Sequence, residues 1–361
     1  MEIYLFYKEE WNRMYNCAYK SDLEWAKEGS ANVVLGSFYM ITGIMYMVSK
    51  TGLKSLHFLQ VPYIPCLFVM LQPDLIKHSC YKIMFFLGVI DFVTLSLNAV
   101  LTGYLTIVGA VYCSYPNLIY VTGSCSMSLW CMACLSCTLL AFNRCVDLWR
   151  PKLMSSLFSD NRTYFWLCLP VAYFLYFFLF TQPVLYSSKA YAMFFDPYFE
   201  IADVTVDRYQ YLNFVHSANN VMVVIVLSIL YVFLSTYLWI KLKSSNSTNL
   251  GAMQRQIVIQ AVVICAFNFM AALIYLYMQF FETSTVFVIV GQIAWQASHG
   301  GPAIVYLTLN KTIRKHVFKM VHLGKWSNST IHVQPASSRR KSVSATTGTQ
   351  HAASPGQIPT S

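Results

Sequence analysis

Residues 92–143, FVTLSLNAVLTGYLTIVGAVYCSYPNLIYVTGSCSMSLWCMACLSCTLLAFN, contain no Asp, Glu, Lys or Arg. A helix that crosses a bilayer needs about 20 apolar residues, so this run of 52 residues is too long for a single crossing. A turn signal, Tyr-Cys-Ser-Tyr-Pro-Asn, lies at 112–117. The stretch therefore contains the end of one membrane-spanning helix, a turn and all of the next helix.

The same shortage of charge recurs along the chain. Of 361 residues, 57% are hydrophobic and 11% are charged, whereas a soluble domain has about 25% charged residues. A soluble protein with so few charges could not cover its own core. We therefore expect an integral membrane protein whose partner is the lipid bilayer and not nucleic acid. Eight apolar segments lie near 30–49, 57–72, 80–104, 118–142, 163–186, 213–240, 256–281 and 284–309.

The distribution of Lys and Arg indicates how the helices are oriented. If the basic C-terminal tail is cytoplasmic, the inner segments of the last six helices carry 17 Lys and Arg and three acids. The outer segments then carry 6 Lys and Arg and 11 acids. The tail is therefore predicted to be cytoplasmic. Two separate crossings at 30–49 and 57–72 would place the acidic N-terminus inside, against this asymmetry. We therefore predict seven crossings and an extracellular N-terminus.

The segment Val48 to Gln60, VSKTGLKSLHFLQ, is foreign to a membrane helix. Removing it joins GIMYM to VPYIPCLFVML as one long apolar run. Its first two residues, Val-Ser, can be encoded as GTAAGT, and its last two, Leu-Gln, can end in CAG, as at the two ends of an intron. We interpret residues 48–60 as an insertion that interrupts the first helix, from a retained intron or a mistaken gene model.

These observations predict an all-α, seven-helix membrane bundle with three further parts. Residues 1–28 contain no apolar block, so we expect no cleavable signal peptide. The predicted organisation is an extracellular segment at 1–29, the seven-helix domain at 30–310, an amphipathic membrane-surface helix at 311–326 and a disordered cytoplasmic tail at 327–361.

Several short phrases occur in an order that resembles a known family. They are YNC at 15–17, GIMYM, YIPCL, SCYKIM at 79–84, LGVIDF at 87–92, SLW at 128–130, NRC at 143–145, FFDP at 194–197, YMQF at 277–280 and GQIAWQASHGGPAIVYLTLNKTIRK at 291–315. Together they resemble the nematode serpentine receptor class T family of candidate chemoreceptors. The resemblance implies the rhodopsin-like G-protein-coupled receptor architecture, an unidentified ligand, a heterotrimeric G-protein partner and the plasma membrane of sensory neurons. The family's YIPCL phrase closes the first helix directly, which supports treating 48–60 as an interruption.

Asp91 is the only formally charged residue deep inside a predicted span. It lies about 16 Å from the cytoplasmic start of its helix at Cys80, near the middle of the bilayer. A buried acid must find polar partners in the bundle interior. One interpretation is a sodium- or proton-linked switch, and the other is a protonated Asp satisfied by its neighbours. The candidate neighbours are Asn98, Ser128, Ser298 and His299.

Asn143-Arg144-Cys145 lies at the cytoplasmic end of the third predicted helix. Rhodopsin-like receptors have an acid, an Arg and an aromatic residue at this place, and the Arg enters the G-protein cleft. The resemblance therefore implies a coupling role for Arg144, with Asn143 in the place of the acid. Asp147 is a candidate ion-pair partner at spacing i, i+3. The alternative is that Arg144 is an interfacial anchor whose long side chain reaches the membrane surface.

Pro302 and Tyr306 resemble the kinked Pro-x-x-Tyr switch of the same superfamily, with one additional spacer. Pro302 removes a helix hydrogen bond and lets the segment bend, and Gly300 and Gly301 are expected to loosen the backbone further. The alternative for the following stretch, 311–326, is membrane anchoring without signalling.

Of the eleven cysteines, only Cys17 and Cys113 face the predicted exterior, so we expect them to form a disulfide. Cys131, Cys134 and Cys137 imitate a metal-ligand spacing, but small residues that permit close helix packing explain them better. We expect no metal site, no cofactor and no catalytic arrangement, and hence a protein that is not an enzyme.

The ligand site is predicted between the outer halves of the third, fifth, sixth and seventh helices. Aromatic residues are expected to line or cap it, and so few charges indicate a small, mostly apolar ligand. The alternative is that these aromatics form an interfacial belt. The rival function is a transporter or a ligand-gated channel, although we find no internal repeat and only one buried acid. The predicted ligand-binding residues are Phe194, Phe195, Tyr198, Tyr277 and Trp295.

Overall fold

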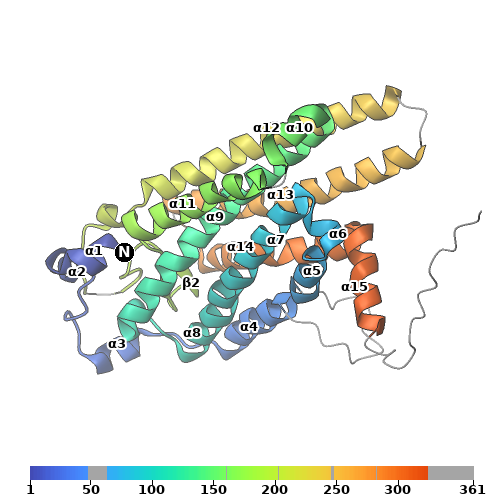
Figure 1. Cartoon of the computed structure of the whole chain (residues 1–361). Helices are drawn as coiled ribbons and strands as arrows, with labels where there is room; N and C mark the ends of the chain where they lie inside the picture. Colours follow the sequence, from blue (N-terminus) through green and yellow to red (C-terminus); the bar gives the residue numbers. More distant parts are fainter. Residues whose placement is uncertain (48–62, 160, 202, 245–247, 282, 324–361) are drawn as a thin grey trace, which may run out of the picture.

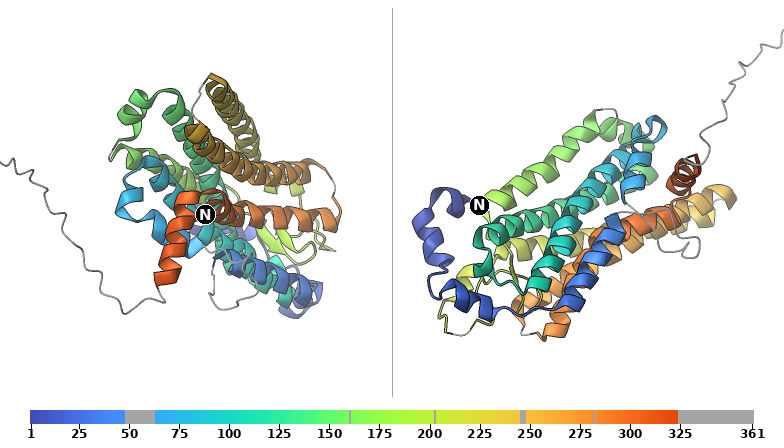
Figure 2. Two further views of the ribbon diagram at one scale, coloured as in Figure 1. Left: turned by 90° about the vertical axis from the view of Figure 1, so that its right-hand side faces the viewer. Right: turned by 90° about the horizontal axis from the view of Figure 1, so that it is seen from below.

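A computed structural model describes residues 1–47, 63–159, 161–201, 203–244, 248–281 and 283–323 of the chain. Within these residues the protein is a bundle of long antiparallel helices, with short helices at one end and α15 (Lys311–Leu323) across the other (Figures 1 and 2). The predicted insertion at 48–60 and the predicted tail at 327–361 lie outside the described residues.

Seven helical segments of the described residues make up the bundle. The first consists of α4 (Val33–Met47) and α5 (Tyr63–Met70), and the second of α7 (Ser79–Leu95), the π-helix η1 (Ser96–Leu101) and α8 (Thr102–Val108). The others are α9 (Pro116–Trp149), α11 (Arg162–Phe180), α12 (Phe214–Ser244), α13 (Thr248–Phe280) and α14 (Thr285–Leu309). The predicted seven-helix fold class is confirmed.

Four described stretches are each long and apolar enough to cross a membrane alone: Ser79–Val108, Pro116–Trp149, Arg162–Phe180 and Phe214–Tyr237. The pair α3 (Asp22–Glu28) and α4 also passes this test, although the two helices meet at an angle of 81°. Exposed aliphatic and aromatic side chains cover the outside of the bundle, for example Phe165 on α11 and Val232 on α12. Such an apolar outer surface is suited to lipid, not to water.

α4 and α5 both pack against the second helical segment. A side chain at Gly36 would collide with the backbone of Gly103, and one at Gly43 would collide with Ala99. Further along, Tyr63 of α5 packs against Gly88 of α7. Because the contacts descend the second segment in order, α4 and α5 follow the same antiparallel path along it.

The π-helix η1 changes the backbone hydrogen bonding of the second segment near the middle of the bundle. π-helical turns inside α-helices frequently occur at functional sites. Here the backbone carbonyl of Asn98 accepts hydrogen bonds from Nε2 of Gln292, at 2.7 Å, and from Nε2 of Gln296, at 3.2 Å. Oε1 of Gln296 in turn accepts a hydrogen bond from Thr42 at 3.2 Å. Polar contacts therefore hold the second segment to α14 and α14 to α4.

A β-hairpin lies between α11 and α12. Its strands β1 (Leu185–Ser187) and β2 (Ala192–Phe194) are antiparallel, with Tyr186 opposite Met193. The hairpin packs directly on α9, because a side chain at Gly123 would collide with the carbonyl oxygen of Val184. The hydroxyls of Tyr186 and Thr106 lie 2.7 Å apart, which attaches the hairpin to α8 as well.

The N-terminal segment, residues 1–29, covers the same end of the bundle. It contains α1 (Glu2–Phe6), α2 (Lys8–Met14) and α3, and it buries Trp11, Tyr15 and Trp25. A disulfide joins Cys17 to Cys113, which lies in the short 3₁₀-helix η2 (Tyr112–Ser114) before α9. The sequence-based pairing of these two cysteines is thus the pairing in the structure.

The opposite end of the bundle carries α6 (Pro73–Ile76), α10 (Pro151–Phe158) and α15. The remaining 3₁₀-helix, η3 (Arg208–Tyr211), directly precedes α12. α15 is amphipathic. Its apolar residues Ile313 and Val317 are buried in a cluster with Cys66 and Met70 of α5. The basic residues Lys311 and Lys315 are left outside this cluster.

Candidate functional site

Asp91 joins three helices at the centre of the bundle. Its side chain is only 2% exposed. The hydroxyl of Tyr63, on α5, donates a hydrogen bond to Oδ2 of Asp91. Nδ1 of His299, on α14, lies 2.7 Å from Oδ1. Both oxygens of this buried acid therefore have a polar partner, as an acid inside a membrane requires.

Pairing with a histidine determines the charge at the centre of the bundle. The Asp91–His299 pair has no net charge in two arrangements. Either a protonated carboxyl lies beside a neutral imidazole, or a carboxylate lies beside a protonated imidazole. A neutral pair avoids most of the cost of burying a single ion. A carboxylate beside a neutral imidazole would instead carry one negative charge, which two hydrogen-bond donors can face: the hydroxyl of Tyr63 and the N–H of His299.

Of the four candidate partners of Asp91, one forms a contact with its carboxylate. His299 pairs with it, whereas Ser128 and Ser298 donate to backbone carbonyls of their own helices. The side-chain amide of Asn98 has no hydrogen-bond partner among the described residues. Tyr63 was missed, because the sequence gives no register between α5 and α7.

One cavity lies on the side of Asp91 that faces the N-terminal segment. We call it the Trp295 cavity, and its volume is about 20 Å³. The indole of Trp130, on α9, lines it and lies edge-on to the ring of His299, with ring centroids 5.8 Å apart. The cavity wall is therefore in direct contact with the Asp91 cluster. The lining residues are Met127, Trp130, Val184, Met193, His216, Tyr275 and Trp295.

Most residues predicted to bind the ligand lie elsewhere. Trp295 lines the cavity, and Phe195 contacts His216 with ring centroids 5.3 Å apart. Tyr198 instead turns toward the N-terminal segment, where its hydroxyl donates to the carbonyl of Asn16 at 2.7 Å. The prediction relied on aromatic residues near the membrane surface, which can form an interfacial belt or pack with each other without facing a cavity.

The other two residues of this prediction, Phe194 and Tyr277, also lie away from the Trp295 cavity. Phe194 stacks on Phe199, with ring centroids 4.2 Å apart, beside the outer ends of α13 and α14. Tyr277 is 46% exposed on the outer face of α13. The sequence offered a signal for the residues it missed: Trp130 and His216 are polar groups inside apolar helices.

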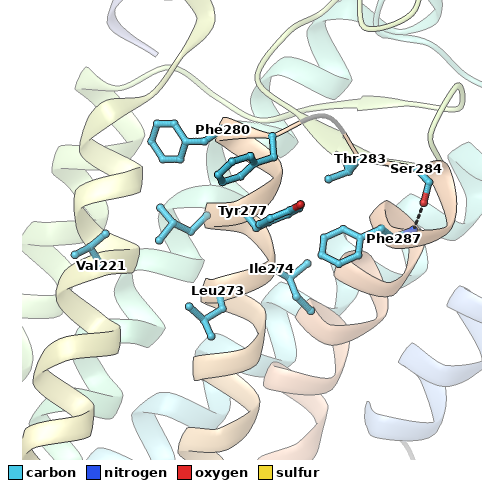
Figure 3. Close-up of a pocket in the computed structure, with 10 residues that line it drawn as sticks. Val221, Leu273, Ile274, Tyr277, Phe280, Thr283, Ser284 and Phe287 are labelled. Carbon is cyan, nitrogen blue, oxygen red and sulfur yellow. Dashed lines mark hydrogen bonds between the residues drawn. The ribbon is translucent and has the colours of Figure 1, made fainter.

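Tyr277 lies in a wide apolar groove across the outer face of α13, which extends from α12 to α14 (Figure 3). We call it the α13 groove, and its volume is about 780 Å³. Its large side chains, such as Phe280 and Phe281, are more than half exposed. The groove is open to the bundle's surroundings, so it resembles a lipid contact more than an enclosed ligand site.

A second cavity, which we call the Arg144 cavity, lies on the opposite side of Asp91. Its volume is also about 20 Å³, and it is lined by residues of α7, α9, α12 and α13. Nη2 of Arg144 lies 3.9 Å from Sδ of Met84, a weak interaction for a guanidinium. Among the described residues Arg144 forms no ion pair, and the expected partner Asp147 is exposed. The i, i+3 ion pair is therefore not formed.

Asn143 faces away from Arg144. Its Nδ2 donates a hydrogen bond to the hydroxyl of Ser79 at 3.0 Å and lies 3.8 Å from Sδ of Met154. Asn143 therefore connects α9 to the start of α7 and to α10. The Asn in place of the superfamily's acid does not restrain Arg144, and instead positions the end of the helix.

Pro302 and Tyr306 lie between the two cavities and α15. Both are buried in α14, and Tyr306 shares an apolar cluster with Tyr63 and Ile313. The hydroxyl of Tyr306 has no hydrogen-bond partner among the described residues. A side chain at Gly300 would collide with the ring of Tyr46, so this glycine permits close packing of α14 on α4. The expectation that Gly300 also loosens the backbone stays a prediction.

Charged contacts attach the N-terminal segment to the loop before α12. Glu28 pairs with Lys20 and, at 3.0 Å, with Lys189 of the hairpin turn. Hydrogen bonds from these two ammonium groups lower the pKa of Glu28 below its ordinary value. In the same loop Asp196 pairs with Arg208 at 3.2 Å, yet burial raises the pKa of its carboxyl.

Together, the fold and the site define a class of protein. A seven-helix bundle with a buried acid on the second segment, an Arg at the end of the third and a Pro and Tyr near the end of the seventh is a receptor of the rhodopsin-like architecture. The match to solved structures agrees at the level of the fold. Squid rhodopsin aligns with a TM-score of 0.56 and 12% sequence identity, over 84% of this chain and 87% of that chain.

The family follows from the sequence comparisons. Residues 2–330 match the family described as serpentine type 7TM GPCR chemoreceptor Srt. The chain is also 26% identical to serpentine receptor class T-55 of Caenorhabditis elegans over 311 aligned residues. The alignment covers 86% of this chain and 80% of that relative. The chain belongs to the Srt family of serpentine receptors. It is therefore a multi-pass membrane receptor of the G-protein-coupled type, and the sequence-based resemblance is confirmed.

Proposed function

We propose that the protein is a chemosensory receptor that binds a small molecule in the Trp295 cavity and activates a heterotrimeric G protein through Arg144. In this proposal the N-terminal segment lies outside the cell, and α15 and the tail lie in the cytoplasm of a sensory neuron. The observation that carries the proposal is a continuous series of contacts between the two cavities, through the Asp91 cluster.

The contacts follow one another from helix to helix. Trp130 in the wall of the Trp295 cavity contacts His299, and His299 pairs with Asp91. Asp91 holds Tyr63, which shares a cluster with Met84 beside Arg144. A ligand that moved Trp130 would therefore shift the His299 ring and alter the proton balance of the Asp91 cluster. Such a two-state element, biased from one site and sensed at another, is what allosteric activation requires.

Arg144 is suited to be the responding residue. Trp130 and Arg144 lie on the same helix, 14 residues apart, which is about 21 Å along the helix axis. Arg144 is half-buried and held by Met84, without an ion pair among the described residues. Little energy therefore opposes its movement into a cleft that opens between α9, α12 and α13. An exposed acidic or carbonyl group of a G protein would then replace Met84 as its partner.

The test measures G-protein activation at matched receptor levels. Membranes containing the wild-type receptor, Arg144→Ala or Arg150→Ala are mixed with purified heterotrimers from each Gα class, and ligand-independent nucleotide exchange is recorded. Arg150 is a matched control, because it stacks on Trp149 at the exposed end of the same helix, with 4.7 Å between its Cζ and the ring centroid. We expect Arg144→Ala to reduce receptor-dependent exchange about tenfold and Arg150→Ala to leave it near the wild-type rate.

Equal exchange in all three membranes would remove Arg144 from the mechanism. A second measurement tests the orientation: an epitope at the N-terminus should be stained on intact cells, and one after Ser361 only after permeabilisation. The reverse pattern would place the N-terminus inside and favour the channel or transporter alternative.

A further inference from the structure

The lining of the Trp295 cavity contains aromatic and aliphatic side chains with few polar atoms. Its seven residues come from α9, α12, α13, α14 and the hairpin region before α12, and none of them is an Asp, Glu, Lys or Arg. Binding an ion here would leave its charge without a counter-charge in a desolvated site, which is strongly unfavourable. The cavity therefore selects uncharged molecules.

Two of the polar groups in the lining already have partners within the protein. Nε1 of Trp130 donates to Oδ1 of Asn220 at 3.0 Å. The hydroxyl of Tyr275 donates to Oε1 of Gln292 at 3.4 Å. These hydrogen bonds hold the two aromatic rings in place as walls of the cavity, so neither hydrogen is free to bind a ligand.

Two other polar atoms of the lining have no hydrogen-bond partner among the described residues: Nδ1 of His216 and Nε1 of Trp295. Both side chains are more than nine-tenths buried, at 6% and 5% exposure. A buried polar atom without a partner costs about 1–3 kcal/mol, and this cost is recovered when a ligand supplies the partner. The indole N–H of Trp295 can only donate, whereas the imidazole nitrogen of His216 can donate or accept.

Because both atoms belong to side chains that line one small cavity, a single oxygen held between them would satisfy both. A carbonyl or ether oxygen can accept from Trp295, and a hydroxyl can also donate to His216. A purely hydrocarbon ligand would leave both nitrogens unsatisfied, and would lose the advantage that the oxygen provides.

The size of the cavity limits the ligand further. About 20 Å³ holds roughly one water molecule, so a ligand must displace side chains as it binds. Met127 and Met193 line the cavity, and the unbranched methionine side chain adapts to new shapes at low cost. A small ligand can thus be accommodated without unfolding the surrounding helices.

Access from water is covered in the described structure. Trp11, Tyr15 and Trp25 of the N-terminal segment belong to the same contiguous apolar cluster as Trp130 and Trp295. The hydroxyl of Tyr211 donates to the carbonyl of Met14, which holds the segment to the loop before α12. A ligand that partitions into lipid would have to enter between the helices, and this requirement favours uncharged molecules.

We infer that the ligand class of this receptor is small, uncharged, mostly apolar molecules that carry one hydrogen-bonding oxygen, held between Trp295 and His216. This inference rests on the proposed ligand-binding role of the Trp295 cavity, but it does not require G-protein coupling. It assigns His216 and Trp295 as the residues that select the oxygen, and Met127 and Met193 as those that adapt to the carbon skeleton.

The experiment uses the full-length receptor in nanodiscs and measures ligand binding by the shift in melting temperature. The probes form matched sets with five to eight carbons: 2-ketones, primary alcohols, the parent alkanes, alkylammonium ions and carboxylates. The receptors are the wild type, Trp295→Phe, His216→Phe and the control Tyr277→Phe, in which a hydroxyl is removed from the α13 groove. Each variant is first compared with the wild type by circular dichroism, so that unfolding is not mistaken for lost binding.

We expect ketones or alcohols to stabilise the wild type and Tyr277→Phe, with affinity at least tenfold lower in both Trp295→Phe and His216→Phe. Alkanes and both charged sets should not stabilise any receptor. Stabilisation by the charged probes, equal binding of alkanes, or unchanged binding in both cavity variants would overturn the inference, as would the absence of stabilisation by every oxygenated probe. Because binding is read without a G protein, a failure of coupling leaves this result unchanged and is identified separately by the Arg144→Ala measurement.

Discussion

Nδ1 of His299 lies 2.7 Å from Oδ1 of Asp91, although 208 residues separate the two in the chain. The contact joins α14 to α7, and both side chains are buried, at 1% and 2% exposure. Tyr63 completes the cluster from α5, so the first, second and seventh helical segments meet at one carboxylate. Any movement of α14 relative to α7 must therefore break or rearrange this pair.

Replacing His299 with Leu is expected to destabilise the receptor by about 3–5 kcal/mol, because it leaves Asp91 as a buried acid with Tyr63 as its remaining partner. Thermal unfolding in detergent measures the effect. The double variant Asp91→Asn, His299→Leu should be more stable than His299→Leu alone, since it removes the unpaired carboxylate. His78→Leu serves as a control at an exposed histidine. Additive losses in the double variant would show that the two residues do not interact.

Much of the fold could be predicted from the sequence, for a simple physical reason. A membrane-spanning helix must be apolar along about 20 residues. This requirement produces charge-free runs such as 92–143, which can be recognised from the sequence alone. Charge asymmetry between the loops then reduced eight apolar segments to seven crossings, and the described residues form seven helical segments. The orientation of these helices in the membrane stays a prediction. The π-helix at Ser96–Leu101 was not predicted, because its residues are as apolar as the helix on either side of it. Gln292 and Gln296 of the distant α14 donate to the carbonyl of Asn98 within it.

The site was less predictable than the fold. Asp91 and Arg144 could be located because a charge inside or beside an apolar helix is conspicuous. Of the five residues predicted to bind the ligand, only Trp295 lines the Trp295 cavity, since an aromatic residue such as Tyr277 has the same local sequence whether it faces lipid or a cavity. The rotation of each helix about its axis decides this, and rotation depends on packing between helices distant in sequence. Buried histidine and tryptophan with unpaired nitrogens are visible only in three dimensions.

Acidification is expected to loosen the N-terminal segment through Glu28. The pKa of Glu28 is held below its ordinary value of 4.5 by hydrogen bonds from Lys20 and Lys189. The unfolded segment therefore takes up the proton first, and the stabilisation is fully present above about pH 4.5 and is lost as the pH falls through the folded value. Hydrogen exchange of residues 21–28 at a series of pH values measures this loss.

The matched variants are Glu28→Gln and Glu10→Gln, compared with the wild type at each pH to remove the intrinsic pH dependence of exchange. Glu28→Gln should exchange faster at neutral pH and approach the wild type under acid conditions. Glu10→Gln should follow the wild type throughout, because Glu10 is exposed and pairs only locally with Arg13. Identical protection in Glu28→Gln and the wild type at neutral pH would contradict the prediction.

The disulfide between Cys17 and Cys113 is expected to contribute about 2–4 kcal/mol, because it restricts the unfolded chain across a sequence separation of 96 residues. Cys17→Ala, Cys113→Ala and the double variant remove the same bond, so all three should lower the stability by similar amounts. Cys168→Ala, at an exposed free cysteine, should have little effect. Thermal unfolding of the four variants and the wild type provides the measurement. A double variant with twice the loss of either single one would show that the thiols act separately and not as a bond.

The working receptor is expected to lack residues 48–60, and the packing of the residues on either side supports this proposal. Six positions of α4 and α5 meet the second helical segment: Gly36, Met40, Gly43, Met47, Tyr63 and Leu67. Their partners descend that segment from Gly103 through Ala99 and Ser96 to Asp91 and Gly88. Without the 13 residues, the six positions recur at intervals of four, three, four, three and four residues, which is the spacing of one continuous helix face.

Deleting residues 48–60 should therefore join α4 and α5 into a single helix, keep the Tyr63–Asp91 hydrogen bond and raise the melting temperature and the surface level. A matched deletion of residues 50–60 retains two additional residues and rotates α5 by about 200° relative to α4, so it should move Tyr63 away from Asp91 and destabilise the protein. Sequencing mature transcripts across codons 47–61 tests the same proposal independently. Thirteen intact codons in the mature message, together with a lower surface level of the 48–60 deletion, would show that the segment is part of the receptor. A mature message that lacks the 13 codons, together with a higher surface level of the 48–60 deletion, would mean that α4 and α5 form one continuous helix in the working receptor.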